Sequence, residues 1–92
     1  MMFPFDENTA VAVITCAHVL HKDMPILYVS HDAADGMWQF LCGGTHQLED
    51  ATVVSLLEIY ERDPSIAALA QLPLGCAARR KCVGDSWTAQ RG

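Results

Sequence analysis

The apolar residues of this chain occur only in short runs, and none is longer than Ala10–Ile14. A helix that crosses a membrane needs roughly 18–20 consecutive apolar residues, so runs of this length indicate the core of a globular domain instead. Short apolar runs that are bounded by turn-forming residues are typical of strands. The chain is therefore expected to be one small domain with a modest core.

Three runs in the first half of the chain have the composition of strands. Ala10–Cys16 is rich in β-branched residues and predicts a strand buried on both faces, followed by one turn of helix at Ala17–His21. Ile26–His31 and Met37–Cys42 predict a second and a third strand. The connection between them ends in Asp35-Gly36, a pair that favours a β-hairpin.

The second half of the chain has helical periodicity. Acidic Glu49-Asp50 opens a predicted helix that ends before Asp63. Its buried face is expected to consist of Val53, Leu56, Leu57 and Tyr60. Asp63-Pro64 is typical of the start of a second, short helix, and Cys76–Val83 predicts a last strand at the sheet edge because its centre is charged. The order β-β-β-α-α-β predicts an α+β fold with a small antiparallel sheet and helices packed on one face.

Charge and length restrict the class of protein. The 92-residue chain has a net charge of −5, which repels phosphate backbones and anionic membranes, so we expect no nucleic-acid and no membrane partner. The basic run Arg79-Arg80-Lys81 is expected to be solvated. We expect a loosely ordered arm over residues 1–9 and one domain over residues 10–92. The N-terminus lacks a basic stretch, which predicts a cytoplasmic protein with reduced thiols.

Two Cys/His pairs are the strongest chemical candidates. Cys16-x-His18 and Cys42-x-x-x-His46 each follow the end of a predicted strand, where two loops can converge. Thiolate sulfur and neutral imidazole nitrogen are ligands that suit a tetrahedral zinc ion. The alternative is that two buried thiols and two surface histidines have no common role, because the spacing does not match common zinc motifs.

The other two cysteines, Cys76 and Cys82, are six residues apart on one predicted strand. They would be roughly 20 Å apart and could not form a disulfide, so a packing role is expected for both. Among the remaining polar residues, His31-Asp32 beside Asp35 could act as a general base with an orienting carboxylate. The alternative is that a turn rich in Asp, with a histidine at the strand end, is ordinary hairpin chemistry.

Aromatic residues are the third group of candidates. Alternation places Trp38 and Phe40 on one face of their strand, and Trp87 lies near the C-terminus. If these side chains are exposed, they form a surface for a protein partner. If they are buried, they are part of the core.

Several strings of residues carry a resemblance to known proteins. They are Pro25-Ile26-Leu27-Tyr28-Val29-Ser30-His31-Asp32, Asp35-Gly36-x-Trp38-Gln39-Phe40-Leu41-Cys42-Gly43, Asp63-Pro64-Ser65, Leu72-Pro73-x-Gly75, Ala77-x-Arg79 and Trp87. From about Ala10 to Trp87 the chain resembles a group of small bacterial proteins of unknown function, which in turn is similar to immunity-protein-like domains near polymorphic toxin systems. The resemblance implies an α+β fold and a protein-binding role, and it brings no catalytic residues with it.

Three functional hypotheses follow from the sequence. The first is a non-enzymatic interaction domain, immunity-like or regulatory, that binds a protein partner or associates with itself. The second is a small zinc-binding protein that uses Cys16, His18, Cys42 and His46. The third is an enzyme with Cys16 or Cys42 as the nucleophile and His18 or His31 as the base, which requires a reactive thiolate.

Overall fold

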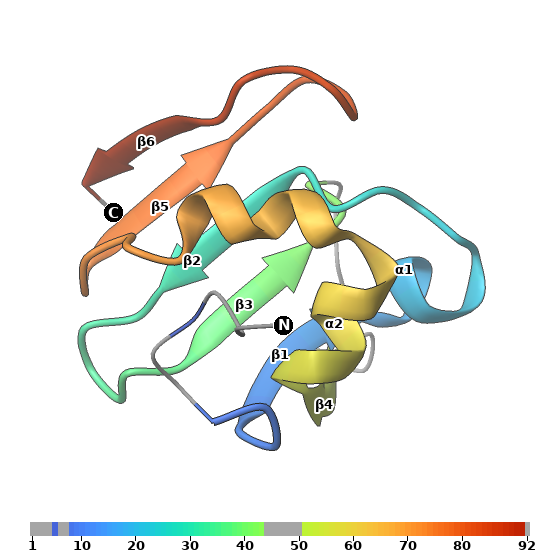
Figure 1. Cartoon of the computed structure of the whole chain (residues 1–92), viewed down its shortest axis with the longest axis horizontal. Helices are drawn as coiled ribbons and strands as arrows, with labels where there is room; N and C mark the ends of the chain where they lie inside the picture. The colour runs from blue at the N-terminus through green and yellow to red at the C-terminus, as the bar shows by residue number, and fades with distance from the viewer. Residues whose placement is uncertain (1–4, 6–7, 44–50, 92) are drawn as a thin grey trace.

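The computed structural model describes Phe5, residues 8–43 and residues 51–91 (Figure 1). Its elements, in chain order, are strand β1 (Ala12–Cys16), helix α1 (Ala17–His21), strands β2 (Tyr28–His31), β3 (Trp38–Leu41) and β4 (Ala51–Ser55), helix α2 (Leu56–Arg62), the 3-10 helix η2 (Pro64–Leu69), and strands β5 (Cys76–Arg79) and β6 (Thr88–Arg91). The fold is α+β, as the sequence predicts. Among the described residues, no helix has the length and apolar character needed to cross a membrane.

One mixed sheet holds all the strands of the described residues, in the order β4-β1-β3-β2-β5-β6. The expectation of a purely antiparallel sheet is wrong at one place, because β1 and β3 pair in parallel, with Thr15 beside Phe40. The other pairs are antiparallel. The strand next to β1 is β3, and β2 lies on the other side of β3. Because β2 and β3 form an antiparallel hairpin, β3 runs in the same direction as β1. As a result, the C-terminal ends of β1 and β3 meet at the same end of the sheet.

The predicted hairpin of β2 and β3 is confirmed. Its strands pair from Tyr28 with Leu41 to His31 with Trp38. The turn is closed by backbone hydrogen bonds from Gly36 N to Asp32 O (2.8 Å) and from Asp32 N to Met37 O (2.8 Å). Gly36 has a φ of 73°, a conformation that favours glycine and accounts for the Asp-Gly signal in the sequence.

The predicted long helix is wrong in its first part. Residues Ala51–Ser55 form strand β4, which pairs antiparallel with β1, and the helix begins only at Leu56. Residues Ala51–Val54 include β-branched side chains that suit a strand as well as a helix, and pairing with β1 decides between the two. Val53 is consequently 65% exposed instead of lying on a buried helix face. Ser55 caps α2 by accepting a hydrogen bond from Glu58 N.

The start of the second helix is predicted correctly. Asp63 caps η2 by accepting a hydrogen bond from Ser65 N (3.1 Å), and Pro64 occupies the first helical position. The prediction for the last strand is only partly right. Strand β5 ends at Arg79 and lies inside the sheet between β2 and β6, and the outer strand is Thr88–Arg91.

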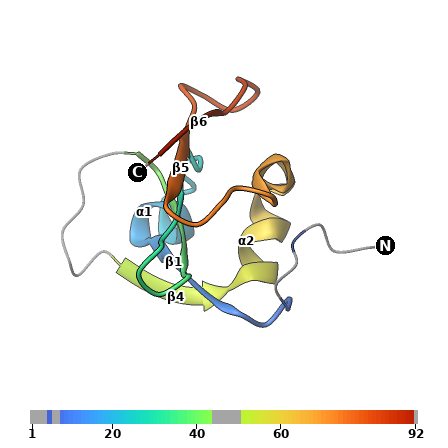
Figure 2. The same ribbon diagram turned by 90° about the vertical axis from the view of Figure 1, so that its left-hand side faces the viewer.

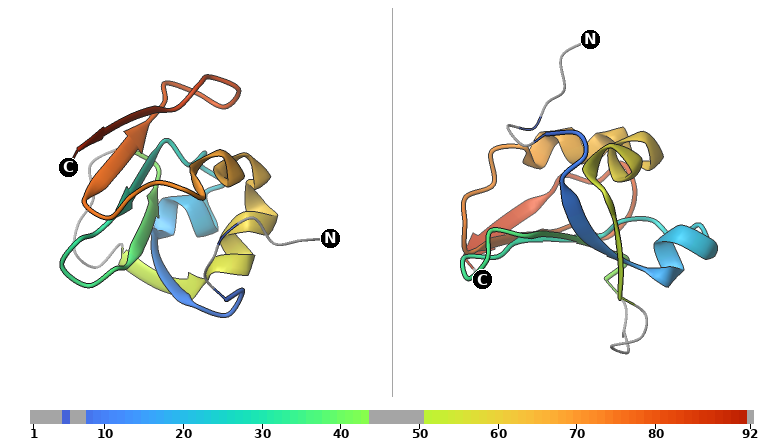
Figure 3. Two further views of the ribbon diagram at one scale, coloured as in Figure 1. Left: turned by 60° about the vertical axis from the view of Figure 1, so that its left-hand side comes forward. Right: turned by 90° about the horizontal axis from the view of Figure 1, so that it is seen from below.

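The core lies between the sheet and one layer of helices. Figure 2 shows α2 on one side of the sheet, and Figure 3 shows α2 and η2 over the same face, whereas α1 lies beyond the end of β1. The largest fully buried side chains include Trp38, Phe40, Leu56 and Ile66. Phe5, from the segment expected to be a loose arm, is also buried and contacts Trp38 edge-on, with ring centroids 5.3 Å apart.

The basic run is not uniformly solvated, which corrects the expectation from the sequence. Arg79 is exposed, but the side chain of Arg80 is only 1% exposed. Arg80 donates to the carboxylate of Asp63 (2.7 Å), to Ser65 Oγ (2.9 Å) and, through two nitrogens, to Ile26 O. It therefore ties the end of β5 to the start of η2, and a buried guanidinium is tolerated there because these acceptors surround it.

Candidate metal centre

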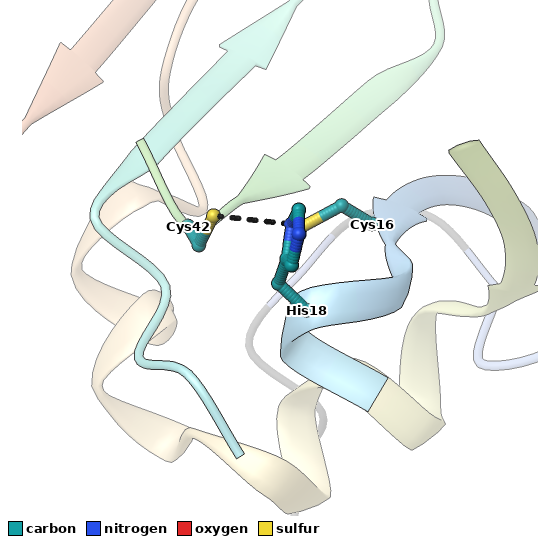
Figure 4. Close-up of side chains that lie close together, drawn as sticks. All are labelled: Cys16, His18 and Cys42. Carbon is teal, nitrogen blue, oxygen red and sulfur yellow. Dashed lines mark hydrogen bonds between the residues drawn. The ribbon is translucent and has the colours of Figure 1, made fainter. Parts of the chain in front are cut away.

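The candidate site lies where the parallel strands β1 and β3 end together. Cys16 is the last residue of β1, and Cys42 directly follows the last residue of β3. His18 is the second residue of α1, which begins immediately after Cys16. Figure 4 shows the three side chains converging from these elements.

The ligand atoms of these residues are close enough to share one ion. Cys16 Sγ, Cys42 Sγ and a ring nitrogen of His18 all lie within 4.8 Å of one another. Cys42 Sγ and His18 Nδ1 are 3.9 Å apart. Cys16 is 1% exposed and Cys42 is 6% exposed, whereas His18 is half-buried. The two cysteines are thus enclosed by protein, and His18 is the more exposed of the three residues.

The backbone around His18 is held in place from two directions. The carbonyl of His18 accepts hydrogen bonds from Lys22 N and Met24 N, both at 3.1 Å, which end α1 after one turn. The next residue, Val19, is buried, and its carbonyl accepts a hydrogen bond from Arg62 of α2. These contacts fix the short helix although it is too short to be stable alone.

The backbone around the two cysteines is fixed by contacts between the strands. Thr15 Oγ1 donates a 2.6 Å hydrogen bond to Phe40 O, which joins β1 to β3 just before the site. After Cys42, Gly43 has a φ of 82° and turns the chain away. Local sequence does not predict this role of Thr15, since its only signal is a hydroxyl next to a cysteine in an apolar strand.

The geometry can be compared with that of a zinc ion. With Zn–S of about 2.3 Å and Zn–N of about 2.0 Å, a tetrahedral ion needs ligand atoms about 3.8 Å (S to S) and 3.5 Å (S to N) apart. The 3.9 Å between Cys42 Sγ and His18 Nδ1 is therefore roughly 0.4 Å longer than the ideal, which small side-chain rotations remove. The other two separations are no longer than 4.8 Å, which is at most about 1.3 Å above these ideals, so the three residues lie close enough together to hold one ion.

Not every residue predicted for the metal site can be placed. Cys16, His18 and Cys42 come together as the zinc hypothesis requires. His46, the predicted fourth ligand, lies outside the described residues. The Cys42–His18 pair also supplies the thiol and the base that the cysteine-enzyme hypothesis requires, and that hypothesis stays a prediction.

The remaining two cysteines have different surroundings. Both are free thiols; Cys76 is half-buried and Cys82 is exposed. The expected packing role is therefore wrong for Cys82, because the strand ends at Arg79 and does not carry Cys82 into the sheet.

His31 and the aspartates of the hairpin have structural contacts. His31 Nδ1 lies 2.8 Å from Leu72 O, and its ring stacks on Trp38 with centroids 4.0 Å apart. Asp32 accepts a hydrogen bond from Gln39 Nε2, and the Asp35 carboxylate accepts one from Met37 N. The contacts of the two aspartates lie within the hairpin, whereas the His31 contact joins the hairpin to the segment that follows η2.

The aromatic residues form part of the core instead of an exposed patch. Trp38 is 2% exposed and Phe40 is fully buried, so neither can contact a protein partner in the folded state. Trp87 packs against the core, as predicted, and Arg80 lies 4.2 Å over its ring. Of the two alternatives left open by the sequence, the core role is the correct one for Trp38 and Phe40.

Comparisons of the chain with protein-family models, with curated proteins and with solved structures found no match.

Proposed function

We propose that this protein is a small zinc-binding domain in which Cys16, His18 and Cys42 hold the ion. The observation that carries the proposal is that three soft ligand atoms from two strand ends and one helix lie within 4.8 Å of one another. The separation along the chain between Cys16 and Cys42 means that the fold, and not local sequence, brings them together.

The chemistry of the ligands favours zinc over other common ions. Calcium and magnesium take oxygen ligands, whereas two thiolates and an imidazole suit zinc. Both sulfurs are buried, which favours an ion with a structural role over one that is open to substrate.

A zinc ion at this position would join three elements that meet at the end of the sheet. It would connect the ends of β1 and β3 to α1, which has only five residues. Because the unfolded chain does not keep these ligands together, binding of the ion adds directly to the free energy of unfolding. A domain of 92 residues has a modest core, so such a contribution is large for it.

A tetrahedral ion takes a fourth ligand. His46 of the Cys42-x-x-x-His46 pair is our proposal for that ligand, since imidazole completes a Cys₂His₂ set.

Titration with Co²⁺ tests this proposal, because Co²⁺ replaces zinc in tetrahedral thiolate sites and then absorbs visible and near-ultraviolet light. The reduced protein is expected to bind one equivalent and to develop sulfur-to-cobalt charge-transfer bands, which zinc removes by displacement. Cys16→Ser and Cys42→Ser are expected to abolish the bands. Cys76→Ser and Cys82→Ser are the matched controls and are expected to leave them unchanged.

The same titration can also reject the proposal. A spectrum without charge-transfer bands, or bands lost equally in the Cys76→Ser control, rules out the site at Cys16 and Cys42. His46→Ala tests the fourth ligand separately and is expected to weaken binding, whereas His21→Ala, on exposed His21, is expected to have no effect.

Self-association is a second candidate, and one observation favours it. Strand β4 is the outer strand on its side of the described sheet, and it carries Val53, which is 65% exposed. An outer strand with an apolar side chain can pair with the same strand of a second copy. This role would agree with the interaction domain that the sequence suggests.

Sedimentation velocity over a range of concentrations tests self-association. The expected result is a dimer that Val53→Lys dissociates, while Val83→Lys, at a comparably exposed apolar residue, leaves it intact. A monomer at every concentration rejects this candidate.

A further inference from the structure

We propose that Cys16 and Cys42 form a reversible disulfide when a hydroperoxide reaches them, and that this disulfide and the metal exclude each other. The proposal rests on the proposed function for the metal part and adds redox regulation to that same site. It would make metal occupancy depend on the oxidation state of the protein.

The separation of the two sulfurs supports this pairing. Cys16 Sγ and Cys42 Sγ lie within 4.8 Å of each other, and a change of one side-chain rotamer moves a sulfur by about 3 Å, which is about the distance that must be closed to reach an S–S bond of about 2.05 Å. Neither cysteine is part of a disulfide in this structure.

The backbone brings both cysteines to the same end of the sheet. The register of β1 and β3 ends with Thr15 beside Phe40, and Cys42 follows the last residue of β3, where the regular alternation of strand side chains no longer applies. The two side chains therefore converge from the ends of neighbouring strands, as the separation of their sulfurs shows.

The fold separates this pair from the other thiols. Cys76 lies on β5, and β2 runs between β5 and β3, which places the two strands about 10 Å apart. Cys82 is exposed and lies beyond the end of β5. Cys16 and Cys42 are therefore each other's nearest partner for a disulfide within the sheet.

The reaction balances with the hydroperoxide as the only oxidant. The Cys42 thiolate, the more exposed of the two, attacks one peroxide oxygen, breaks the O–O bond and becomes a sulfenic acid. The Cys16 thiolate then attacks the Cys42 sulfur, forms the S–S bond and releases hydroxide. Two electrons leave the sulfurs, and with hydrogen peroxide the two oxygens leave as two waters after taking up two protons.

The disulfide removes the metal because it consumes both thiolate ligands. Only the thiolate form of cysteine holds zinc, and a disulfide sulfur carries no charge to contribute. His18 alone remains of the three converging ligands.

The test uses a Cys76→Ser/Cys82→Ser variant, in which Cys16 and Cys42 are the only cysteines. One sample is loaded with zinc and another is metal-free, and both are treated with hydrogen peroxide and digested with trypsin after denaturation. Lys22 and Arg62 place the two cysteines on separate peptides, residues 1–22 and 23–62, so a disulfide appears as a cross-linked peptide pair. Released zinc is followed with a colorimetric chelator.

The expected result is the cross-linked pair in both samples, with about one zinc released per disulfide and rebinding after dithiothreitol. Sulfinic acid on either cysteine without a cross-link, or unchanged thiols after treatment, overturns the proposal. The zinc content of the untreated, reduced protein decides the proposed function separately. Zinc bound without a cross-link after peroxide rejects the disulfide alone, and a cross-link in a protein that never bound zinc rejects the metal site alone.

Discussion

Arg80 is the buried charge at the junction of β5 and η2, and replacing it with methionine tests whether its contacts hold these elements together. Methionine keeps much of the apolar length of the side chain and removes all the hydrogen bonds. The substitution leaves the Asp63 carboxylate without its 2.7 Å partner and removes both donors to Ile26 O.

The expected loss of unfolding free energy follows from the burial of the Arg80–Asp63 ion pair. Removing one partner of a buried ion pair costs about 3–5 kcal/mol, and we expect about 3 kcal/mol here because Asp63 is 18% exposed and water can solvate it in part. Loss of the contact with Trp87 adds roughly 0.5–1 kcal/mol. A chain of this length has a free energy of unfolding of about 5–14 kcal/mol, so the loss is a large share of it.

Arg79→Met is the matched control because Arg79 is the adjacent residue with the same side chain. It is exposed, and its guanidinium lies 4.7 Å over the ring of Tyr28. An exposed contact of this kind contributes about 0.5–1 kcal/mol.

The assay is urea unfolding followed by circular dichroism, in the absence of metal. With a slope of about 1 kcal/mol per molar urea, Arg80→Met is expected to lower the midpoint by about 3.5–4 M and Arg79→Met by less than about 1 M. Equal midpoints for the two variants would refute the reasoning, since the difference in burial would then have no energetic consequence.

Three further predictions concern the site and its support. Thr15→Val removes the 2.6 Å hydrogen bond to Phe40 O and is expected to lower the free energy of unfolding by about 1–2 kcal/mol in urea; an unchanged midpoint would contradict the role given to the hydroxyl. Gly43→Ala forces alanine to a φ of 82°, and we expect the free energy of unfolding to fall by about 1–2 kcal/mol. Zinc binding measured by calorimetry is expected to weaken as well, and an unchanged zinc affinity would show that the turn at residue 43 does not position the ligands. Zinc at about 100 times its dissociation constant is expected to add about 2.7 kcal/mol and to raise the melting temperature by at least about 10 °C. Cys16→Ser is expected to abolish that rise, and a rise that persists in this variant would assign the effect to another site.

The sequence predicts those parts of the fold that depend on neighbouring residues. The hairpin turn at Gly36 and the cap at Asp63 follow from backbone preferences of single residues, and both are confirmed. Helix α1 is also found where the sequence predicts it.

The sequence does not predict features that depend on distant residues. Val53 fits the periodicity of the following helix, but pairing of Val54 with Val13 makes this segment a strand. Likewise, nothing near Arg80 indicates that Asp63 will bury it, because the two residues meet only in the folded chain.

The candidate site depends on both neighbouring and distant residues. The residue types and the strand ends are visible in the sequence, which is why Cys16, His18 and Cys42 could be named as ligands. Their convergence depends on the parallel pairing of β1 and β3, which local patterns do not reveal. In an antiparallel pair, the ends of these two strands would lie at opposite ends of the sheet.

Native mass spectrometry of the untagged, reduced protein mixed with one equivalent of zinc tests the central claim most directly. We expect the wild-type protein to carry one zinc ion, and the Cys42→Ser variant to be metal-free under the same conditions. The Cys82→Ser variant, which changes an exposed thiol, is expected to carry zinc like the wild type. A metal-free wild-type protein, or zinc retained fully by Cys42→Ser, would contradict the account.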